Sequence, residues 1–229
     1  MFRIGMFTSG YQRNPLENVF EDAKRFGYDY IELWGGRPHA YAPDLAAGEI
    51  DEVIRLRDKY GVPITGYCPE HNAYPYNFMI GSERQREDAV GYLKLCLDQA
   101  KALGSDYMLI SPAHAGYEAT YEEMHDRLYR TCEELAKHAE NVGVHIVVEP
   151  LTPEESNVFR SANDLIELFE HASSRLKTGL DRKDSQRRRH APLAWKPEHD
   201  SMCDEAREAS VWLTAILWVS IRGPLRAKV

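Results

Sequence analysis

The sequence predicts an α/β protein, a (β/α)8 TIM barrel that is incomplete, with about six βα units followed by a different tail. Three observations support this class. Short apolar runs alternate with long amphipathic segments through residues 1–181. The runs recur at intervals of about 30 residues or more, which suits parallel strands joined by helical crossovers. No G-x-G-x-x-G follows the first run, where a dinucleotide-binding sheet would carry one.

Six runs are expected to form strands, at 2–7, 29–34, 62–67, 106–111, 144–149 and 176–181. Apolar residues recur at helical spacing between them. Four of these helical segments end on a glycine just before the next strand, as C-terminal capping predicts: Gly27, Gly61, Gly104 and Gly143. Doubly wound sheets share this rhythm. The barrel is favoured because six units in 1–181 extrapolate to the roughly 250 residues that eight units need.

Composition indicates a soluble globular protein, with 43% hydrophobic and 28% charged residues. The net charge of −8 is uneven. Residues 1–181 carry 18 Lys and Arg against 30 Asp and Glu, a balance of −12. An acidic body disfavours nucleic acid as a partner, because phosphate neutralisation needs clustered cations.

Cysteines and apolar stretches favour a cytoplasmic protein without a membrane span. The four cysteines form no CxxC pair and are expected to be small buried hydrophobes: Cys68, Cys96, Cys132 and Cys203. The N-terminus lacks the apolar region and cleavage site of a signal peptide. The longest uncharged apolar stretch, 210–221, is shorter than the roughly 20 residues that span a bilayer.

Residues 182–229 break the rhythm and form a separate, atypical tail. They carry 10 Lys and Arg against 6 Asp and Glu, and three of the four tryptophans. No further βα unit is evident there. Our hypothesis is that a shifted reading frame encodes this tail.

Polar residues follow the expected strands where the carboxyl ends of a barrel meet at one mouth. Glu149 and Asp181 each close an apolar run, Trp34 closes an earlier one, and His71 and His114 follow two others. Carboxylates with imidazoles suit Mn²⁺, Co²⁺, Mg²⁺ or Zn²⁺. The carboxylates could instead cap helices or pair with Arg, and each histidine alone could be a hydrogen-bonded loop residue.

Glu32 lies inside an expected strand, where burial is costly without a partner. We expect it to line the barrel in an ion pair. Trp34 has two interpretations, a packing residue or an aromatic surface on which a sugar ring stacks.

Several segments resemble the xylose isomerase-like sugar epimerases. They include Ile31-Glu32-Leu33-Trp34-Gly35-Gly36-Arg37-Pro38-His39, Ser111-Pro112-Ala113-His114-Ala115-Gly116 and Glu149-Pro150-Leu151-Thr152-Pro153. The resemblance covers roughly 1–181. It implies a small-molecule partner, a sugar or glycated amino acid, and is compatible with a homo-oligomer.

The resemblance also implies a cofactor and residue roles. One divalent metal ion (Mn, Co, Ni, Mg or Zn) would be bound by Glu149 and Asp181, with Glu155 contacting the substrate beside Trp34, His71 and His114. The implied reaction inverts C3 of a ketose or ketosamine such as fructoselysine, giving psicoselysine, by proton abstraction next to the C2 ketone. Glu149 would be one of two glutamates that exchange the proton. The family's strand-seven His and strand-eight Glu have no convincing counterpart in 182–229.

Two other functions remain open. An apurinic-site endonuclease on the same barrel would use His71, His114 and Glu149 in a multi-zinc site. That branch expects a histidine where this chain has Asp184, and its DNA-binding face conflicts with the acidic body. The other possibility is an inactive remnant that binds sugar without turning it over.

Overall fold

Five parallel strands form one sheet in the computed structural model, which describes residues 3–73, 75–158 and 164. The strands are β1 (Gly5–Phe7), β2 (Tyr30–Gly35), β3 (Ile64–Pro69), β4 (Tyr107–Ile110) and β5 (His145–Val148). Their order in space is β1-β2-β3-β4-β5, and all neighbours are parallel. A doubly wound sheet reverses its order at a switch point. The unbroken order is therefore that of consecutive barrel strands.

The first five predicted strands are thereby confirmed, with boundaries shifted by a few residues. The sixth, at 176–181, lies outside the described residues, as does the tail at 182–229. Both the proposed domain boundary and the frameshift hypothesis stay predictions.

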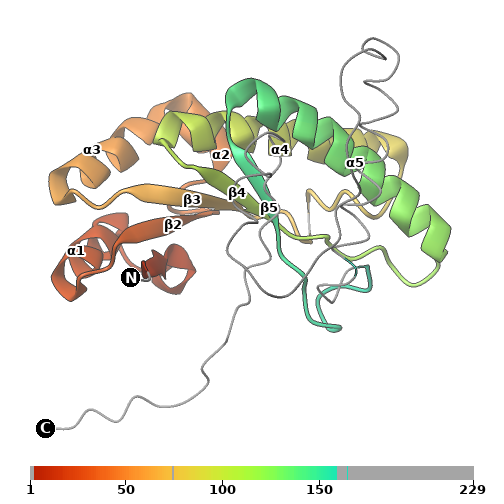
Figure 1. Ribbon diagram of the computed structural model, residues 1–229, viewed down its shortest axis with the longest axis horizontal. Coiled ribbons are helices and arrows are strands. Elements are labelled where there is room, and N and C mark those ends of the chain that lie inside the picture. Colours follow the sequence, from red (N-terminus) through yellow and green to blue (C-terminus); the bar gives the residue numbers. More distant parts are fainter. Residues whose placement is uncertain (1–2, 74, 159–163, 165–229) are drawn as a thin grey trace, which may run out of the picture.

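Four long helices form a curved outer layer around the sheet (Figure 1): α1 (Leu16–Phe26), α3 (Ile50–Tyr60), α4 (Glu83–Leu103) and α5 (Tyr121–Val142). Each of them contacts the next one along the chain, in the same order as the strands. Three short helical segments lie in the first two connections: η1 (Thr8–Tyr11), α2 (Ala42–Asp44) and η2 (Leu45–Glu49).

Local capping sets the ends of these helices. Capping boxes start α4 at Ser82 and α5 at Thr120. In each, the N-cap side chain accepts a hydrogen bond from the N3 amide, and the N3 side chain accepts one from the N-cap amide. The predicted glycines end the four long helices in left-handed conformation, with φ of 75°, 65°, 81° and 72°. Sequence alone thus determines where each βα unit turns back to the sheet.

One face of the sheet is an apolar layer against the helices. Leu33, Tyr67, Met108 and Ile146 are paired in register across four strands, and all are buried in the main core. Burial of such a side chain stabilises the fold by about 1.5–3 kcal/mol. Tyr67 is one of these core residues, and its hydroxyl donates to the Ala40 carbonyl at 2.7 Å.

The opposite face of the sheet is polar in its middle row. Glu32, Gly66, Tyr107 and His145 are paired in register there, because side chains alternate along each strand. In a barrel this face is the interior. At the carboxyl ends of the strands, the Glu149 amide donates to the Ile110 carbonyl at 2.9 Å and so extends the hydrogen bonding between β4 and β5 by one residue.

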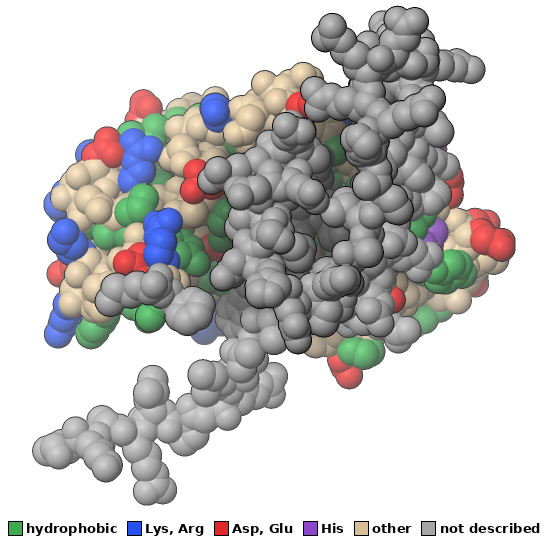
Figure 2. Space-filling model, in the orientation of Figure 1, with side chains coloured by type: hydrophobic (Ala, Val, Ile, Leu, Met, Phe, Trp, Pro, Cys, Tyr) green, Lys and Arg blue, Asp and Glu red, His purple; other side chains and the backbone are tan. Residues whose placement is uncertain are grey.

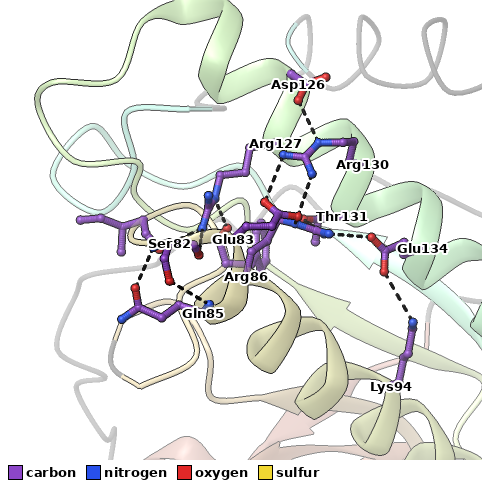
Figure 3. Close-up of polar contacts among 12 residues, drawn as sticks. Ser82, Glu83, Gln85, Arg86, Lys94, Asp126, Arg127, Arg130, Thr131 and Glu134 are labelled. Atoms are coloured by element: carbon purple, nitrogen blue, oxygen red, sulfur yellow. Dashed lines mark hydrogen bonds and ion pairs between the residues drawn. The ribbon is translucent and has the colours of Figure 1, made fainter.

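A charged network joins α4 to α5 (Figure 3). Arg86 is only 4% exposed and donates to Glu83 and Glu134, at 2.7 and 2.8 Å. Arg130 of α5 also donates to Glu83, at 2.8 Å. Arg127 of α5 donates to three carbonyls of the β3–α4 loop, those of Phe78, Ile80 and Ser82. Through Arg127, α5 holds the loop that follows β3.

The outer surface carries both signs of charge. Lys, Arg, Asp and Glu side chains intermingle over α1 and α3 (Figure 2), where Lys59 of α3 pairs with Glu17 of α1. In the described part of the chain, no helix is long and apolar enough to cross a membrane. Cys68, Cys96 and Cys132 are free thiols; Cys96 is buried and the other two are half-buried.

Candidate active site

The predicted site residues lie at the carboxyl ends of four neighbouring strands, apart from Asp181, which is outside the described residues. Trp34 is the second-to-last residue of β2, His71 follows β3, His114 follows β4 and Glu149 follows β5. Consecutive parallel strands present these ends at one edge of the sheet. The structure therefore gathers the predicted residues at one mouth.

Glu149 is a half-buried carboxylate in an acidic environment. Burial raises the pKa of Glu149 above its usual value, and the negative charges of Glu32 and Glu155 raise it further. No Lys or Arg of the described residues appears among the groups that shift this pKa. A carboxylate of this kind exchanges protons closer to neutral pH and attracts a cation.

Glu155 is exposed on the turn after β5. Its carboxylate accepts from the Thr152 hydroxyl at 2.8 Å, and its amide donates to the Thr152 carbonyl at 3.0 Å. The Thr152 hydroxyl holds the Glu155 carboxylate in this turn, and the negative charge of Glu155 contributes to the raised pKa of Glu149. A role in binding substrate stays a prediction.

Glu32 lies in the middle of the polar row and is 9% exposed. Within the described residues Glu32 forms no ion pair; the partner of its carboxylate there is the Tyr107 hydroxyl, which donates to it from β4 across β3. Burial raises the pKa of Glu32, and the bond from Tyr107 offsets part of this rise. A neutral donor is sufficient because burial shifts the carboxyl toward its uncharged form.

Gly66 of β3 makes room for this bond. A Cβ at Gly66 would lie 2.4 Å from Cζ of Tyr107, so the tyrosine ring lies over the bare glycine backbone. Tyr107 was not among the candidates from sequence. An apolar strand offers no local signal that one of its tyrosines contacts a glutamate two strands away.

Trp34 and Glu70 are joined at the mouth. The Trp34 indole Nε1 donates to Oε2 of Glu70 at 3.2 Å, and the Trp34 amide donates to the Thr8 hydroxyl at 2.8 Å. The indole ring lies against Gly36, where a Cβ would come within 2.2 Å of it. Glu70 follows β3 directly, so its strand-end position was the available signal.

The two histidines have partners in the loops. His71 is 3% exposed, stacks on Phe78 and accepts from the Ser111 amide through Nε2 at 3.1 Å. Burial lowers the pKa of His71 to about 4. His114 is half-buried and accepts from the Gly116 amide through Nδ1 at 3.0 Å. His71 thus joins the loops after β3 and β4.

The described residues do not by themselves form a metal site. Within the described ranges, no group of three or more His, Cys, Asp and Glu side chains could hold a metal ion. His71, His114 and Glu149 are therefore not assembled there into the multi-zinc site of the endonuclease alternative. Glu149 suits one position of a metal site, since it is an oxygen ligand with acidic neighbours.

The fold and the mouth define the class of protein. The family model for the xylose isomerase-like TIM barrel matches residues 20–195. The chain therefore belongs to this family, which confirms the resemblance and the barrel class.

Two curated relatives are similar to this chain over most of its length. They are named fructoselysine 3-epimerase and come from Escherichia coli O157:H7 and Shigella flexneri. Each is 50% identical over 164 residues, which is 72% of this chain. The match covers 60% of the first relative and 59% of the second, so the chain spans about three fifths of their length.

Solved structures share the fold at low sequence identity. 3-Keto-D-glucoside 4-epimerase from E. coli has a TM-score of 0.64 at 15% identity, covering 76% of this chain and 65% of that one. D-psicose 3-epimerase with D-tagatose, from Clostridium cellulolyticum H10, has a TM-score of 0.61 at 17% identity, covering 75% and 60%. These likenesses support the barrel architecture.

Proposed function

We propose that this chain is a sugar epimerase that inverts C3 of a ketose or ketosamine, with fructoselysine as its preferred substrate class. The observation that carries the proposal is the half-buried Glu149 carboxylate at the carboxyl end of β5, in a chain 50% identical to relatives named fructoselysine 3-epimerase. Glu149 is the group best placed to take a proton, since burial raises its pKa.

Glu149 and Asp181 are the residues that would hold one divalent metal ion. When bound, such an ion polarises the substrate carbonyl and makes the adjacent carbon acidic. The acidic surroundings of Glu149 support this assignment, because the described residues that shift its pKa include no cation to neutralise it.

The described residues would carry out the first step, the removal of the proton from C3. The Glu149 carboxylate accepts the C3 proton, since burial raises its pKa. Glu155 would hold a substrate hydroxyl beside the reacting carbon. Inversion then needs a proton donor on the opposite face of C3, beyond the described residues.

The test uses the full chain with Mn²⁺, Co²⁺ or Zn²⁺ added separately. Fructoselysine is incubated in D₂O, and NMR follows loss of the C3 proton signal and appearance of the C3 epimer. We expect metal-dependent exchange that falls at least about 100-fold in Glu149→Gln, the size of a general-base effect. Glu154→Gln is the control, since Glu154 is exposed on the same turn.

Two outcomes contradict the proposal. One is the absence of exchange and of epimer with every metal, which would favour the inactive remnant. The other is equal exchange in Glu149→Gln and in the control. Cleavage of abasic DNA in a parallel assay would favour the endonuclease.

A further inference from the structure

We propose that Glu70, held in place by Trp34, selects amine-bearing sugars by binding the secondary ammonium at C1 of a ketosamine. This inference rests on the proposed function and deepens it. It assigns substrate selection to a residue outside the group that moves the proton.

Register places the pair at the mouth. Trp34 is paired with Cys68, and Glu70 comes directly after Pro69, the last residue of β3. Both side chains therefore lie at the carboxyl ends of neighbouring strands, on the same edge as Glu149. A sugar with C2 and C3 at Glu149 has its C1 substituent free to point along this edge.

One carboxylate oxygen of Glu70 is held and the other is available. Oε2 accepts from Trp34 Nε1 at 3.2 Å, while Oε1 has no hydrogen-bond partner in the described part of the chain. Gly36 fixes the indole from behind, since the ring occupies the space of a Cβ there. A carboxylate fixed at one oxygen loses little freedom when the other binds an ammonium.

The surrounding charge favours a cation. Burial raises the pKa of the half-buried Cys68 thiol, and the charges of Glu32, Glu149 and Glu70 raise it further. The three carboxylates thus act on one point between β2 and β5. An ammonium bound at Glu70 pairs with that carboxylate, whereas a neutral sugar leaves it without an opposite charge.

Trp34 contributes in a second way. Its indole is half-exposed and lies beside the carboxylate. An aromatic face attracts an alkylammonium and its adjacent CH₂ groups. Carboxylate and indole together therefore match the –CH₂–NH₂⁺–CH₂– unit that distinguishes a ketosamine from a simple ketose.

The experiment measures binding with two probes that differ at one atom. They are N-butylfructosamine and the C1 butyl ether of fructose, in which oxygen replaces the ammonium. Isothermal titration calorimetry of the full chain should show tighter binding of the amine, with a preference that shrinks as salt is raised. Glu70→Gln should weaken binding of the amine about tenfold and leave the ether unchanged, as expected for loss of one charge-assisted hydrogen bond.

Two further variants sharpen the result. Trp34→Phe keeps an aromatic ring but removes the Nε1 donor, and it should give a loss smaller than that of Glu70→Gln. Glu87→Gln is the matched control, because Glu87 is exposed on α4. It should bind both probes as the unaltered chain does.

The outcomes separate this inference from the proposed function. Equal affinity of the unaltered chain for both probes, or an unchanged preference in Glu70→Gln, overturns the role of Glu70 even where epimerisation occurs. A preference that depends on Glu70 without epimerisation supports the role of Glu70 and overturns the function. If neither probe binds, both the role of Glu70 and the proposed function are contradicted.

Discussion

Tyr107 of β4 donates its hydroxyl to the Glu32 carboxylate of β2, and the strand between them contributes Gly66 to the same row. The tyrosine ring crosses β3 because that position has no side chain. The bond satisfies a carboxylate that is 9% exposed, close enough to Glu149 to influence its pKa. The contact between β2 and β4 next to the candidate site therefore requires a glycine in β3.

Gly66→Ala should destabilise the protein by about 1–3 kcal/mol, as overpacking in a filled interior does. The new Cβ would lie 2.4 Å from Tyr107 Cζ and 2.6 Å from its hydroxyl oxygen. The ring must move, and the bond to Glu32 is lost with it. Urea denaturation measures the change in the free energy of unfolding.

Gly91→Ala is the matched control for this substitution. Gly91 is inside α4, and a Cβ there meets nothing within 4 Å. Alanine should therefore leave stability unchanged or raise it by about 0.5–1 kcal/mol through helix propensity. If Gly66→Ala proves as stable as Gly91→Ala, the close approach of Tyr107 to Gly66 is wrong.

Tyr107→Phe should destabilise the protein in a pH-dependent way. Glu32 already has a raised pKa in the folded state, and without the tyrosine donor this pKa rises further. The folded state then binds a proton that the unfolded state releases above its ordinary pKa of 4.5. The variant should be less stable than the unaltered chain by about 1–3 kcal/mol at pH 7, with a smaller difference below pH 4.5.

Thermal unfolding at several pH values tests this sign. A Tyr107→Phe deficit that is constant from acid to neutral pH would mean that Glu32 does not carry the effect. Tyr117→Phe provides the background, because Tyr117 is 96% exposed.

Local sequence signals were sufficient for the outline of the fold. Apolar runs predicted β1 to β5, and glycines such as Gly104 marked the helix ends, since both depend on residues close in sequence. The position of Glu149 at the mouth also followed from sequence, because parallel strands all end at one edge. These inferences need no knowledge of register.

Contacts across the sheet could not be obtained in this way. The bond between Tyr107 and Glu32 joins residues 75 apart, and that between His71 and the Ser111 amide joins residues 40 apart. Each depends on which residues face each other in adjacent strands and loops. An ion pair was expected for Glu32 because charge is visible in a sequence, whereas a tyrosine two strands away is not.

His71 should make stability fall between pH 6.5 and about pH 4. Burial holds its folded pKa at about 4, below the ordinary 6.5, so the unfolded state binds a proton that the folded state refuses in this range. The contribution is fully present above pH 6.5 and is lost as the pH falls to about 4. The gap between the two values corresponds to about 3 kcal/mol.

His71→Gln isolates this contribution. Glutamine can still accept from the Ser111 amide but does not titrate in this range. Denaturant melts at pH 7 and pH 4.5 should show a smaller acid-induced loss in the variant than in the unaltered chain. Parallel losses in the two proteins would exclude His71 as the titrating group.

Arg86→Met should destabilise the contact between α4 and α5 by about 1–2 kcal/mol. This cost lies near the lower limit of what the loss of hydrogen bonds to charged groups usually costs. Arg86 is 4% exposed and bonds Glu83, Glu134 and Thr131. In the variant each acidic partner still has another ion pair: Glu83 with Arg130 at 2.8 Å, and Glu134 with Lys94 at 3.6 Å. Both carboxylates are more than a third exposed.

Removal of Arg86 therefore strands no buried charge, which is why the cost stays below that of breaking a fully buried pair. The pKa of Glu83, which Arg130 and then Arg86 lower to about 2, should rise in the variant and remain below its ordinary value, because Arg130 persists. Arg84→Met, exposed on the same helix, controls for the loss of a charge from α4. Equal urea midpoints for Arg84→Met and Arg86→Met would show that the network contributes no more than a solvated arginine does.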